Sequence, residues 1–536
     1  MTDRERATIR FEPSGRAVTV GVGETLLAAA RRAGVAIDAP CGGTGRCGSC
    51  RVRAEGMLSP LSADESELLG GASVAAGWRL ACRARAEGDV TVTVPEPAAD
   101  ARIVAESGQV PAEVEPPERR GIDALGPLAG AAIDLGTTAI AVLLVDLRSG
   151  ETLASAGALN PQRAYGADVL SRVAYAMHGG AAELQHAVAR PLDAMLVETL
   201  DRAGLPHEAL VEAVVVGNTA MTGLLAGADV APLGEAPYEG APVGGAVLPA
   251  HALGMSTFPS LDLLVPPAAG AFVGSDITAG IAAADIEGRP GATLFIDLGT
   301  NGEIVLSSGG ELVAASTAAG PAFEGAAIEC GMRAVAGAVE RVWLVDGDVR
   351  LGVIGDREPA GICGSGLLDL IAVLLDAGIV EASGRMADEA DGLLGERLAS
   401  RDGVRAFRVD APGDVMLTQK DVRQVQLAVG AIRAGTTLLL QEAGRGTGDV
   451  ANVVVAGGFG YHVRGEALVR LGLLPAEWAG RVTFAGNTAL EGARRALLGS
   501  GERERIRDIA SRMRIVDLAA HADFQARFLE SLSFPG

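Results

Sequence analysis

A five-residue phrase that occurs twice in this chain constrains its fold more than any other feature. Residues 133–137 read Ile-Asp-Leu-Gly-Thr, and residues 296–300 repeat the same five letters. In each copy an apolar run ends at the Asp, turns through Leu-Gly-Thr, passes a small polar residue (Thr138 or Asn301) and continues as a second apolar run. Repetition at this range indicates a duplicated domain, with a β-hairpin in each copy.

The tip of each hairpin carries the groups that bind phosphate and Mg²⁺. Its Asp offers carboxylate oxygens to a hard cation, and its hydroxyls and backbone N–H groups suit phosphate. The alternative is an ordinary hairpin in which Asp and Gly serve only the turn. Two identical copies between β-rich apolar segments favour the nucleotide site. Asp134 and Asp297 are then the candidate catalytic acids, and either could act as a general base or as an anchor of Mg²⁺ through water.

Length and composition limit what the chain can be. Its 536 residues exceed one core and predict three or four domains, and the hydrophobic fraction of 49% allows large cores. The formal net charge of −22 repels nucleic acid and anionic membrane surfaces, so neither is expected as a partner. Lys420 is the only lysine. A Walker A loop, which needs a phosphate-binding Lys, is therefore excluded.

The ends and apolar runs of the chain bear on its location. The N-terminal stretch MTDRERATIRFEP lacks the apolar core of a signal peptide, and every long apolar run is interrupted by Gly, Pro or charge. We therefore expect a cytoplasmic protein.

Four of the six cysteines fall within the first hundred residues. Strands over 7–11 and 17–22 and a helix over 24–33 are expected to precede a Gly-rich loop with Cys41, Cys47 and Cys50, and Cys82 follows later. Three thiols in one loop and a distant fourth fit an iron–sulfur cluster better than zinc, which favours two close pairs. Disulfides are disfavoured in a reducing cytosol. Cys330 and Cys363 are expected to be small buried residues.

This segment resembles the 2Fe-2S ferredoxins of the β-grasp fold, and its C-x5-C-x2-C spacing is that of the adrenodoxin-like branch. The resemblance implies a 2Fe-2S cluster held by Cys41, Cys47, Cys50 and Cys82. The loop glycines, Gly42, Gly43, Gly45 and Gly48, would let backbone N–H groups approach the sulfides.

A change of composition separates this domain from the rest. Residues 95–127 are rich in Pro, Ala, Glu and Gly without periodicity, as in an extended tether. Beyond it, antiparallel strands followed by alternating strands and helices occur twice, which indicates two related α/β lobes facing a cleft. We expect a ferredoxin-like domain over 1–96, a linker over 97–128, a first lobe over 129–290 and a second over 291–536.

The order of motifs in the two lobes resembles the superfamily of acetate and sugar kinases, heat-shock chaperone ATPases and actin, with duplicated RNase-H-like lobes. The resemblance implies an ATP site with phosphate motifs at 134–138 and 297–301, connecting helices at 217–221 and 487–492, and an adenosine motif at 457–460. The implied nucleotide-binding residues are Gly136, Thr137, Thr138, Gly299, Thr300, Asn301, Gly364, Ser365, Gly366, Gly457, Gly458 and Gly460.

The combination of domains over the whole chain is similar to the reductive activators of corrinoid proteins. The phrases at 319–325, 362–366, 424–428 and 456–460 look like that family's. The resemblance implies ATP- and Mg²⁺-dependent electron transfer from the 2Fe-2S cluster to the cob(II)amide of a corrinoid protein or cobalamin-dependent methyltransferase, with an upstream reductase. A branch with C-terminal 4Fe-4S clusters is excluded because too few cysteines remain. A homodimer stays open.

Two other functions stay open at this level. The chain could be a small-molecule kinase with an attached redox domain, or an ATP-gated electron donor to a non-corrinoid enzyme. The loop over 319–324 has two possible roles. In one, Phe323 and Glu324 contact the corrinoid partner; in the other, Phe323 packs in the core while Glu324 caps a helix.

Overall fold

The fold was analysed in a computed structural model. It describes residues 6–35, 37, 39, 42–45, 48, 50–95, 114–116, 126–238, 244–325, 327–410, 412–458 and 463–536. Two of the four expected cluster ligands, Cys41 and Cys47, and the expected nucleotide residue Gly460 lie outside these residues. Most of the expected linker does so too.

The N-terminal domain is a five-stranded sheet in the order β2-β1-β5-β3-β4, with β1 and β5 parallel. Alternate residues of β1, including Ile9 and Phe11, are buried beneath α1, as the alternating sequence predicts. This arrangement confirms the predicted β-grasp domain. Its elements are β1 (Arg6–Glu12), β2 (Arg16–Gly21), α1 (Leu26–Ala33), β3 (Arg51–Leu58), α2 (Ala63–Leu69), α3 (Gly71–Ala75), β4 (Trp78–Leu80) and β5 (Ala86–Thr93).

The first lobe is built on a six-stranded sheet in the order β10-β11-β9-β6-β7-β8. Helices α5 and α6 cover one face, where Leu192 and Leu224 pack against Ile133 and Val142 of the central strands. The lobe contains β6 (Ala129–Leu135), β7 (Ala139–Asp146), β8 (Thr152–Leu159), α4 (Val169–Tyr175), α5 (Ala181–Ala203), β9 (Leu210–Gly217), α6 (Thr219–Ala226), β10 (Ala246–Pro249), β11 (Asp262–Val265) and α7 (Ser275–Ala284).

The second lobe repeats this topology. Its main sheet has the order β22-β21-β12-β13-β14-β23, so the run β22 to β14 matches β11 to β8 of the first lobe strand for strand, with the same parallel and antiparallel pairs. The predicted duplication is thereby confirmed. The sheet strands are β12 (Ala292–Leu298), β13 (Gly302–Ser308), β14 (Glu311–Thr317), β21 (Val450–Ala456), β22 (Val482–Gly486) and β23 (Arg514–Ile515).

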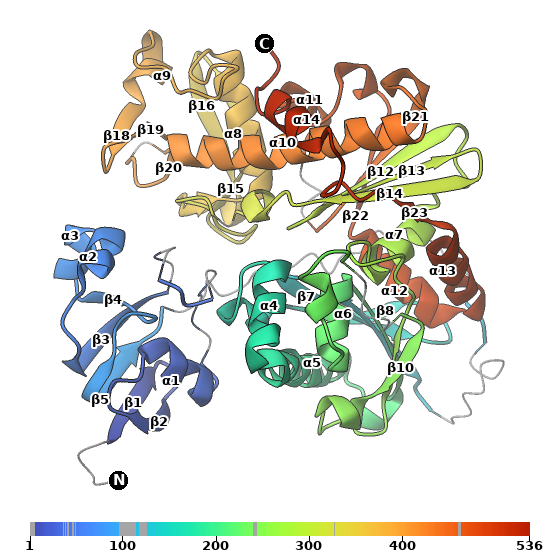
Figure 1. The fold of residues 1–536 in the computed structure, drawn as a ribbon, viewed down its shortest axis with the longest axis horizontal. Coiled ribbons are helices and arrows are strands. Elements are labelled where there is room, and N and C mark those ends of the chain that lie inside the picture. Colours follow the sequence, from blue (N-terminus) through green and yellow to red (C-terminus); the bar gives the residue numbers. More distant parts are fainter. Residues whose placement is uncertain are drawn as a thin grey trace.

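The remaining elements of the second lobe surround this sheet (Figure 1). They are β15 (Ala338–Val345), β16 (Asp348–Val353), β17 (Gly361–Ile362), α8 (Gly364–Asp376), α9 (Gly392–Glu396), β18 (Leu398–Arg401), β19 (Val404–Arg408), β20 (Met416–Thr418), α10 (Gln419–Glu442), α11 (Gly465–Arg470), α12 (Thr488–Leu498), α13 (Ser500–Arg512) and α14 (Phe524–Glu530). Helices α8 and α10 contribute Leu367 and Val425 to the core beneath the main sheet.

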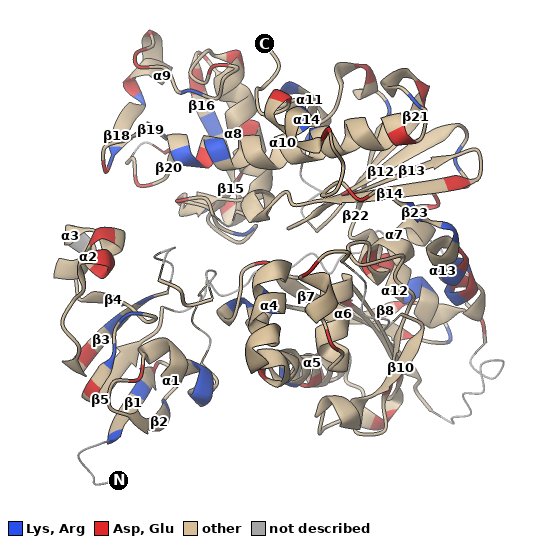
Figure 2. Cartoon of the chain, in the orientation of Figure 1, with Lys and Arg blue, Asp and Glu red and all other residues tan. Residues whose placement is uncertain are grey.

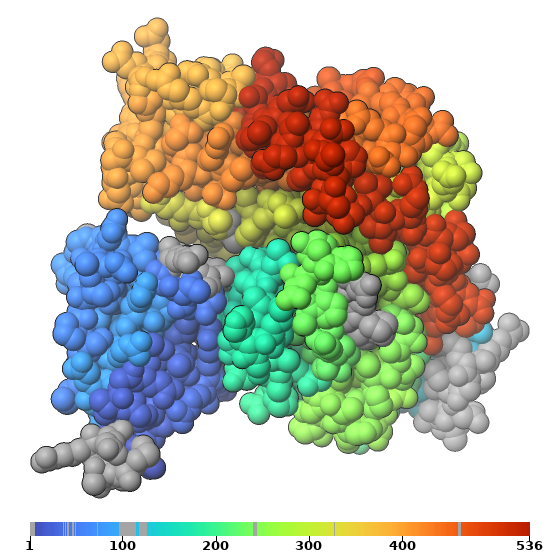
Figure 3. All heavy atoms as spheres, viewed as in Figure 1, coloured from blue at the N-terminus to red at the C-terminus, as the bar shows by residue number. Residues whose placement is uncertain are grey.

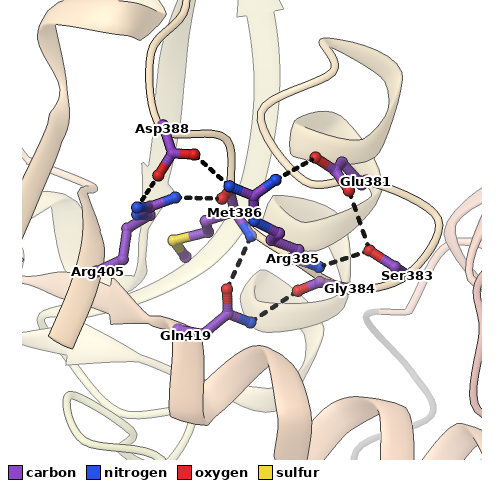
Figure 4. Close-up of polar contacts among 8 residues, drawn as sticks. All are labelled: Glu381, Ser383, Gly384, Arg385, Met386, Asp388, Arg405 and Gln419. Atoms are coloured by element: carbon purple, nitrogen blue, oxygen red, sulfur yellow. Dashed lines mark hydrogen bonds and ion pairs between the residues drawn. The ribbon is translucent and has the colours of Figure 1, made fainter.

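A polar network joins the start of α10 to the turn over 381–388 (Figure 4). The amide of Gln419 accepts a bond from the Met386 N–H at 2.8 Å and donates to the Gly384 carbonyl at 2.7 Å. Asp388 pairs with both Arg385 and Arg405. The network therefore holds the turn over 381–388 against the start of the long helix α10.

Two helices lie between the two main sheets. α7 and α12 contribute Ile277 and Leu490 to one core, which also holds Leu143 from the first sheet and Phe295 from the second. The helices cross closely, because a Cβ added at Gly492 would lie 2.3 Å from the Ala279 carbonyl oxygen. The last part of the chain therefore helps to build the first lobe, and the cleft lies where both sheets approach these helices.

Candidate functional site: a nucleotide cleft and a cluster loop

The tips of the duplicated hairpins meet in one cleft between the lobes. The hydroxyl oxygens of Thr138 and Thr300 are 3.1 Å apart, although 162 positions separate them in sequence. Asp134 is the penultimate residue of β6 and Asp297 the penultimate residue of β12, so corresponding positions of the two sheets carry the two acids. The repeated phrase therefore forms a single site with two related halves.

Nearly all of the expected nucleotide-binding residues line this cleft. Gly366 does not; a Cβ there would lie 2.1 Å from the Val339 carbonyl oxygen, so this glycine serves the packing of α8 on β15. Gly460 lies outside the described residues. The expected residues on the lining are Asp134, Gly136, Thr137, Thr138, Asp297, Gly299, Thr300, Asn301, Gly364, Ser365, Gly457 and Gly458.

The turn after β21 lies close to the second phosphate motif, which belongs to the same lobe. Gly457 has φ of +115°, and a Cβ there would lie 2.3 Å from the Leu298 carbonyl oxygen. A Cβ at Gly458 would meet nothing within 4 Å. Gly457 is therefore the position where the turn itself requires glycine.

Two asparagines at helix N-termini orient the hairpin tips. The Asn487 amide donates to the Asp134 carboxylate at 2.8 Å while its carbonyl oxygen caps α12. The Asn218 amide donates to the Thr137 hydroxyl at 2.9 Å while its carbonyl oxygen caps α6. Each asparagine is the N-cap of a helix that the family resemblance identified as a connecting helix. Their contacts to the hairpin depend on the tertiary fold.

Carboxylates are concentrated in the cleft; sequence reasoning missed Asp276 and Glu303, and it considered Glu324 only as a partner contact or a helix cap. Asp276 begins α7, Glu303 lies on β13 and Glu324 follows β14, and all three line the cleft with Asp134 and Asp297. A signal was available for Glu303, since an acid inside an otherwise apolar strand requires a partner or a function. Asp276 had no such signal, because an acid at a helix start is ordinary capping chemistry.

Burial and mutual repulsion raise the pKa values of these acids. Burial, with the charges of Asp134 and Asp297, raises the pKa of Asp276 to about 8. Burial, with the charges of Asp134 and Glu324, raises the pKa of Asp297 to about 7. Burial also raises the pKa of Asp134 to about 6, although the Asn487 hydrogen bond lowers it. A divalent cation beside these acids would remove the repulsion, but among the described residues no three such side chains are placed to hold a metal ion by themselves.

The loop over 319–324 contains both a packing residue and a cleft residue. Phe323 is fully buried in the core of the second lobe, so its packing alternative is confirmed. Glu324 accepts a hydrogen bond from the Thr300 hydroxyl at 2.8 Å and lines the cleft. The helix-capping role considered for Glu324 is therefore wrong, because the third strand's loop folds back over the second hairpin tip.

The cluster ligands that the structure describes lie together. Cys50 precedes β3 and Cys82 follows β4, and the pairing of these strands brings the two sulfurs within 3.2 Å. Both side chains are buried and neither forms a disulfide. Adjacent buried thiols beside a glycine loop fit the donor set of a 2Fe-2S cluster.

The two remaining cysteines lie in the second lobe. Cys363 is buried, as expected, but Cys330 is half-buried and its sulfur accepts the Met416 N–H at 3.4 Å. The expectation of two buried apolar side chains is therefore wrong for Cys330. Among the residues that the structure describes, no helix is both long and apolar enough to cross a membrane.

Family models match three consecutive parts of the chain. Residues 9–87 match the 2Fe-2S iron-sulfur cluster binding domain, residues 129–289 the RACo middle region, and residues 291–536 the C-terminal ASKHA domain of RACo. These matches fall on the domain with the thiols and on the two lobes that form the cleft.

Curated relatives and a solved structure show the same combination. The chain is 34% identical to the corrinoid activation enzyme RamQ of Eubacterium limosum, over 70% of this chain and 65% of that protein. It is 28% identical to the [Co(II) methylated amine-specific corrinoid protein] reductase of Methanosarcina barkeri, over 72% of each. The chain thus spans about two thirds to three quarters of these relatives.

The solved structure of a reductive activator for corrinoid,iron-sulfur protein is similar over almost the full length. Its TM-score is 0.74 at 28% identity, covering 99% of this chain and 98% of that one. The agreement includes the β-grasp domain and both lobes of the ATPase fold. From its three matching domains in this order and its full-length structural similarity, the chain belongs to the RACo family.

Proposed function

We propose that this protein uses ATP to drive electron transfer from a 2Fe-2S cluster to the cob(II)amide of a corrinoid protein, which returns the corrinoid to cob(I)amide. The observation that supports it best is the presence, in one chain, of adjacent buried thiols in a ferredoxin fold and a duplicated phosphate-type cleft in the lobes. The partner would be a corrinoid protein or cobalamin-dependent methyltransferase.

The cluster would be held by Cys50 and Cys82 together with Cys41 and Cys47, and it supplies one electron at a time. An upstream reductase must then restore the electron after each transfer. Such clusters have potentials near about −400 mV, so reducing a lower-potential cobalt couple is uphill by about 2.3 kcal/mol for each 100 mV. Binding of nucleotide at micromolar affinity, worth about 8 kcal/mol, is large enough to offset such a cost.

The cleft residues divide into three roles in this proposal. Thr137, Thr138 and Thr300 offer hydroxyls to phosphate, and the Arg333 guanidinium on the lining suits the same anion. The carboxylates would hold Mg²⁺. Burial raises the pKa of Asp134 to about 6 although the Asn487 amide lowers it, so a bound cation would favour the ionised form of this acid.

Asp297 is the better candidate for the general base. Burial and neighbouring charges raise its pKa to about 7, close to the pH at which a cytoplasmic enzyme works. We place the protein in the cytoplasm, where its thiols stay reduced.

The direct test combines the full chain carrying its cluster with a corrinoid protein in the cob(II)amide state. We expect cob(I)amide absorbance to develop only with a low-potential electron donor and Mg-ATP, and to be lost in Asp134→Asn and Asp297→Asn. Asp262→Asn, at an exposed position on β11, is the matched control. ATP-independent reduction at the full rate, or a phosphorylated small molecule as product, would contradict the proposal. Light scattering of the same sample would test for a homodimer.

A further inference from the structure

An arginine of the N-terminal domain contacts the first lobe. Arg31, in the last turn of α1, donates to the Ala164 carbonyl oxygen at 2.5 Å across 133 sequence positions. Its guanidinium carbon also lies 4.8 Å from the Tyr165 ring centroid and 5.5 Å from that of Tyr175. Both distances are within the range of cation–π attraction. Figures 2 and 3 show the basic end of α1 and the contact between the domain and the first lobe.

The same contact reaches the cluster-binding loop. Arg31 donates to the Gly42 carbonyl oxygen at 3.4 Å, and Gly42 directly follows one of the expected cluster ligands. A Cβ added at Gly42 would lie 3.2 Å from the Tyr165 carbonyl oxygen, so the loop and the lobe approach closely. Gly42 therefore lies against residues 160–166, which we call the docking segment.

The docking segment is also bonded to the first phosphate hairpin. The Asn160 N–H donates to the Thr138 carbonyl oxygen at 2.9 Å, and the Asn160 amide donates to that of Gly136 at 2.9 Å. Between them, the Arg172 guanidinium donates to the Thr137 carbonyl oxygen at 2.5 Å and to that of Gly166 at 3.0 Å. All three carbonyls of the hairpin tip are thus held by this segment and the arginine beneath it.

These bonds are hard to break individually. Asn160 and Arg172 are fully buried, and a buried polar group left unsatisfied is strongly destabilising, most of all when it is charged. The hairpin tip and the docking segment are therefore expected to move together. The Thr138 and Thr300 hydroxyls are 3.1 Å apart where the two hairpin tips meet. A phosphate that enters between the tips would separate these hydroxyls, and the docking segment, to which Arg31 is bonded, would move with the first tip.

We propose that the docking segment links the two functional sites, so that binding of nucleotide at the hairpins and docking of the cluster domain through Arg31 oppose each other. This inference rests on the proposed ATP site. Nucleotide would weaken the Arg31 contact and free the cluster loop to face the corrinoid partner. Thermodynamic linkage requires the reverse effect too, so loss of the Arg31 contact should strengthen nucleotide binding by the same factor.

The reverse effect provides the sharper test, because Arg31 lies outside the cleft. We would measure the Kd of Mg²⁺ with a non-hydrolysable ATP analogue by calorimetry, on the full chain with its cluster. Arg31→Ala is expected to bind more tightly, by on the order of fivefold. Arg32→Ala is the matched control; this neighbour pairs with Glu24 within its own domain at 3.0 Å and is expected to leave Kd unchanged. Tyr165→Leu, on the other side of the contact, should resemble Arg31→Ala.

A second measurement reports docking itself. In the wild type, the nucleotide analogue should increase hydrogen exchange in the peptides that cover residues 26–33 and 42–45, and Arg31→Ala should show the faster exchange without nucleotide. If Arg31→Ala retains its cluster absorbance but binds the nucleotide analogue with equal or lower affinity, and hydrogen exchange is unchanged, the linkage is wrong and the proposed function is unaffected. Failure of the wild type to bind nucleotide at all would overturn the proposed function first.

Discussion

Asp276 makes a quantitative test of the charged cleft possible. Its carboxyl is buried and its pKa is raised to about 8 by burial and by the charges of Asp134 and Asp297. In the unfolded chain its pKa should be close to the ordinary 3.8. Between these two values the folded protein holds a proton that the unfolded chain has released. Raising the pH therefore lowers the free energy of unfolding.

The size of the effect follows from one proton. Each pH unit between the two pKa values costs about 1.4 kcal/mol, so from pH 5.5 to 7.5 this group removes about 2–3 kcal/mol of stability. Asp276→Asn removes the titration but keeps the side-chain oxygen that accepts the Ile277 N–H at 2.9 Å. The variant should thus gain stability relative to the wild type as the pH rises, by roughly 2–3 °C in Tm over this interval.

The assay is thermal unfolding of wild type and variant at several pH values, with a chelator present so that no cation neutralises the cleft. Asp262→Asn, exposed on β11, is expected to run parallel to the wild type. A constant difference between wild type and Asp276→Asn across pH 5.5 to 7.5, or a variant that loses relative stability as the pH rises, would refute the reasoning.

Two further pairs of variants test local requirements. Gly457→Ala should destabilise the chain by more than about 1–2 kcal/mol and weaken ATP-analogue binding, because φ is positive and the new Cβ would meet the Leu298 carbonyl oxygen. Gly458→Ala meets no protein atom and should keep the wild-type stability in the same denaturation series. Cys82→Ser should lose the visible absorbance of the cluster but still bind the ATP analogue, whereas Cys363→Ser should keep both properties. Cluster absorbance retained in Cys82→Ser would remove that residue from the ligand set.

Local pattern alone predicted much of the secondary structure. The repeated phrase at 133–137 and 296–300 predicted the two hairpins and their relation, and the strands expected over 7–11 and 17–22 and the helix expected over 24–33 are found as β1, β2 and α1. Alternation of apolar residues in β1 and helical spacing in α1 predicted the ferredoxin-like start. These features depend on neighbours within a few residues, so the sequence suffices to indicate them.

Only the tertiary structure decided how these pieces complete one another. The Asn487 amide reaches Asp134 across 353 positions because α12 packs between the two sheets, and Asp276 joins the acids because α7 packs beside α12. The contact of Arg31 with Ala164 arises in the same way, from surfaces that meet after folding. No local periodicity encodes such contacts, since each depends on the burial of elements distant in the chain. The sequence by itself therefore determined the hairpins and the domain order, whereas packing of α7 and α12 between the sheets determined which charges share the cleft.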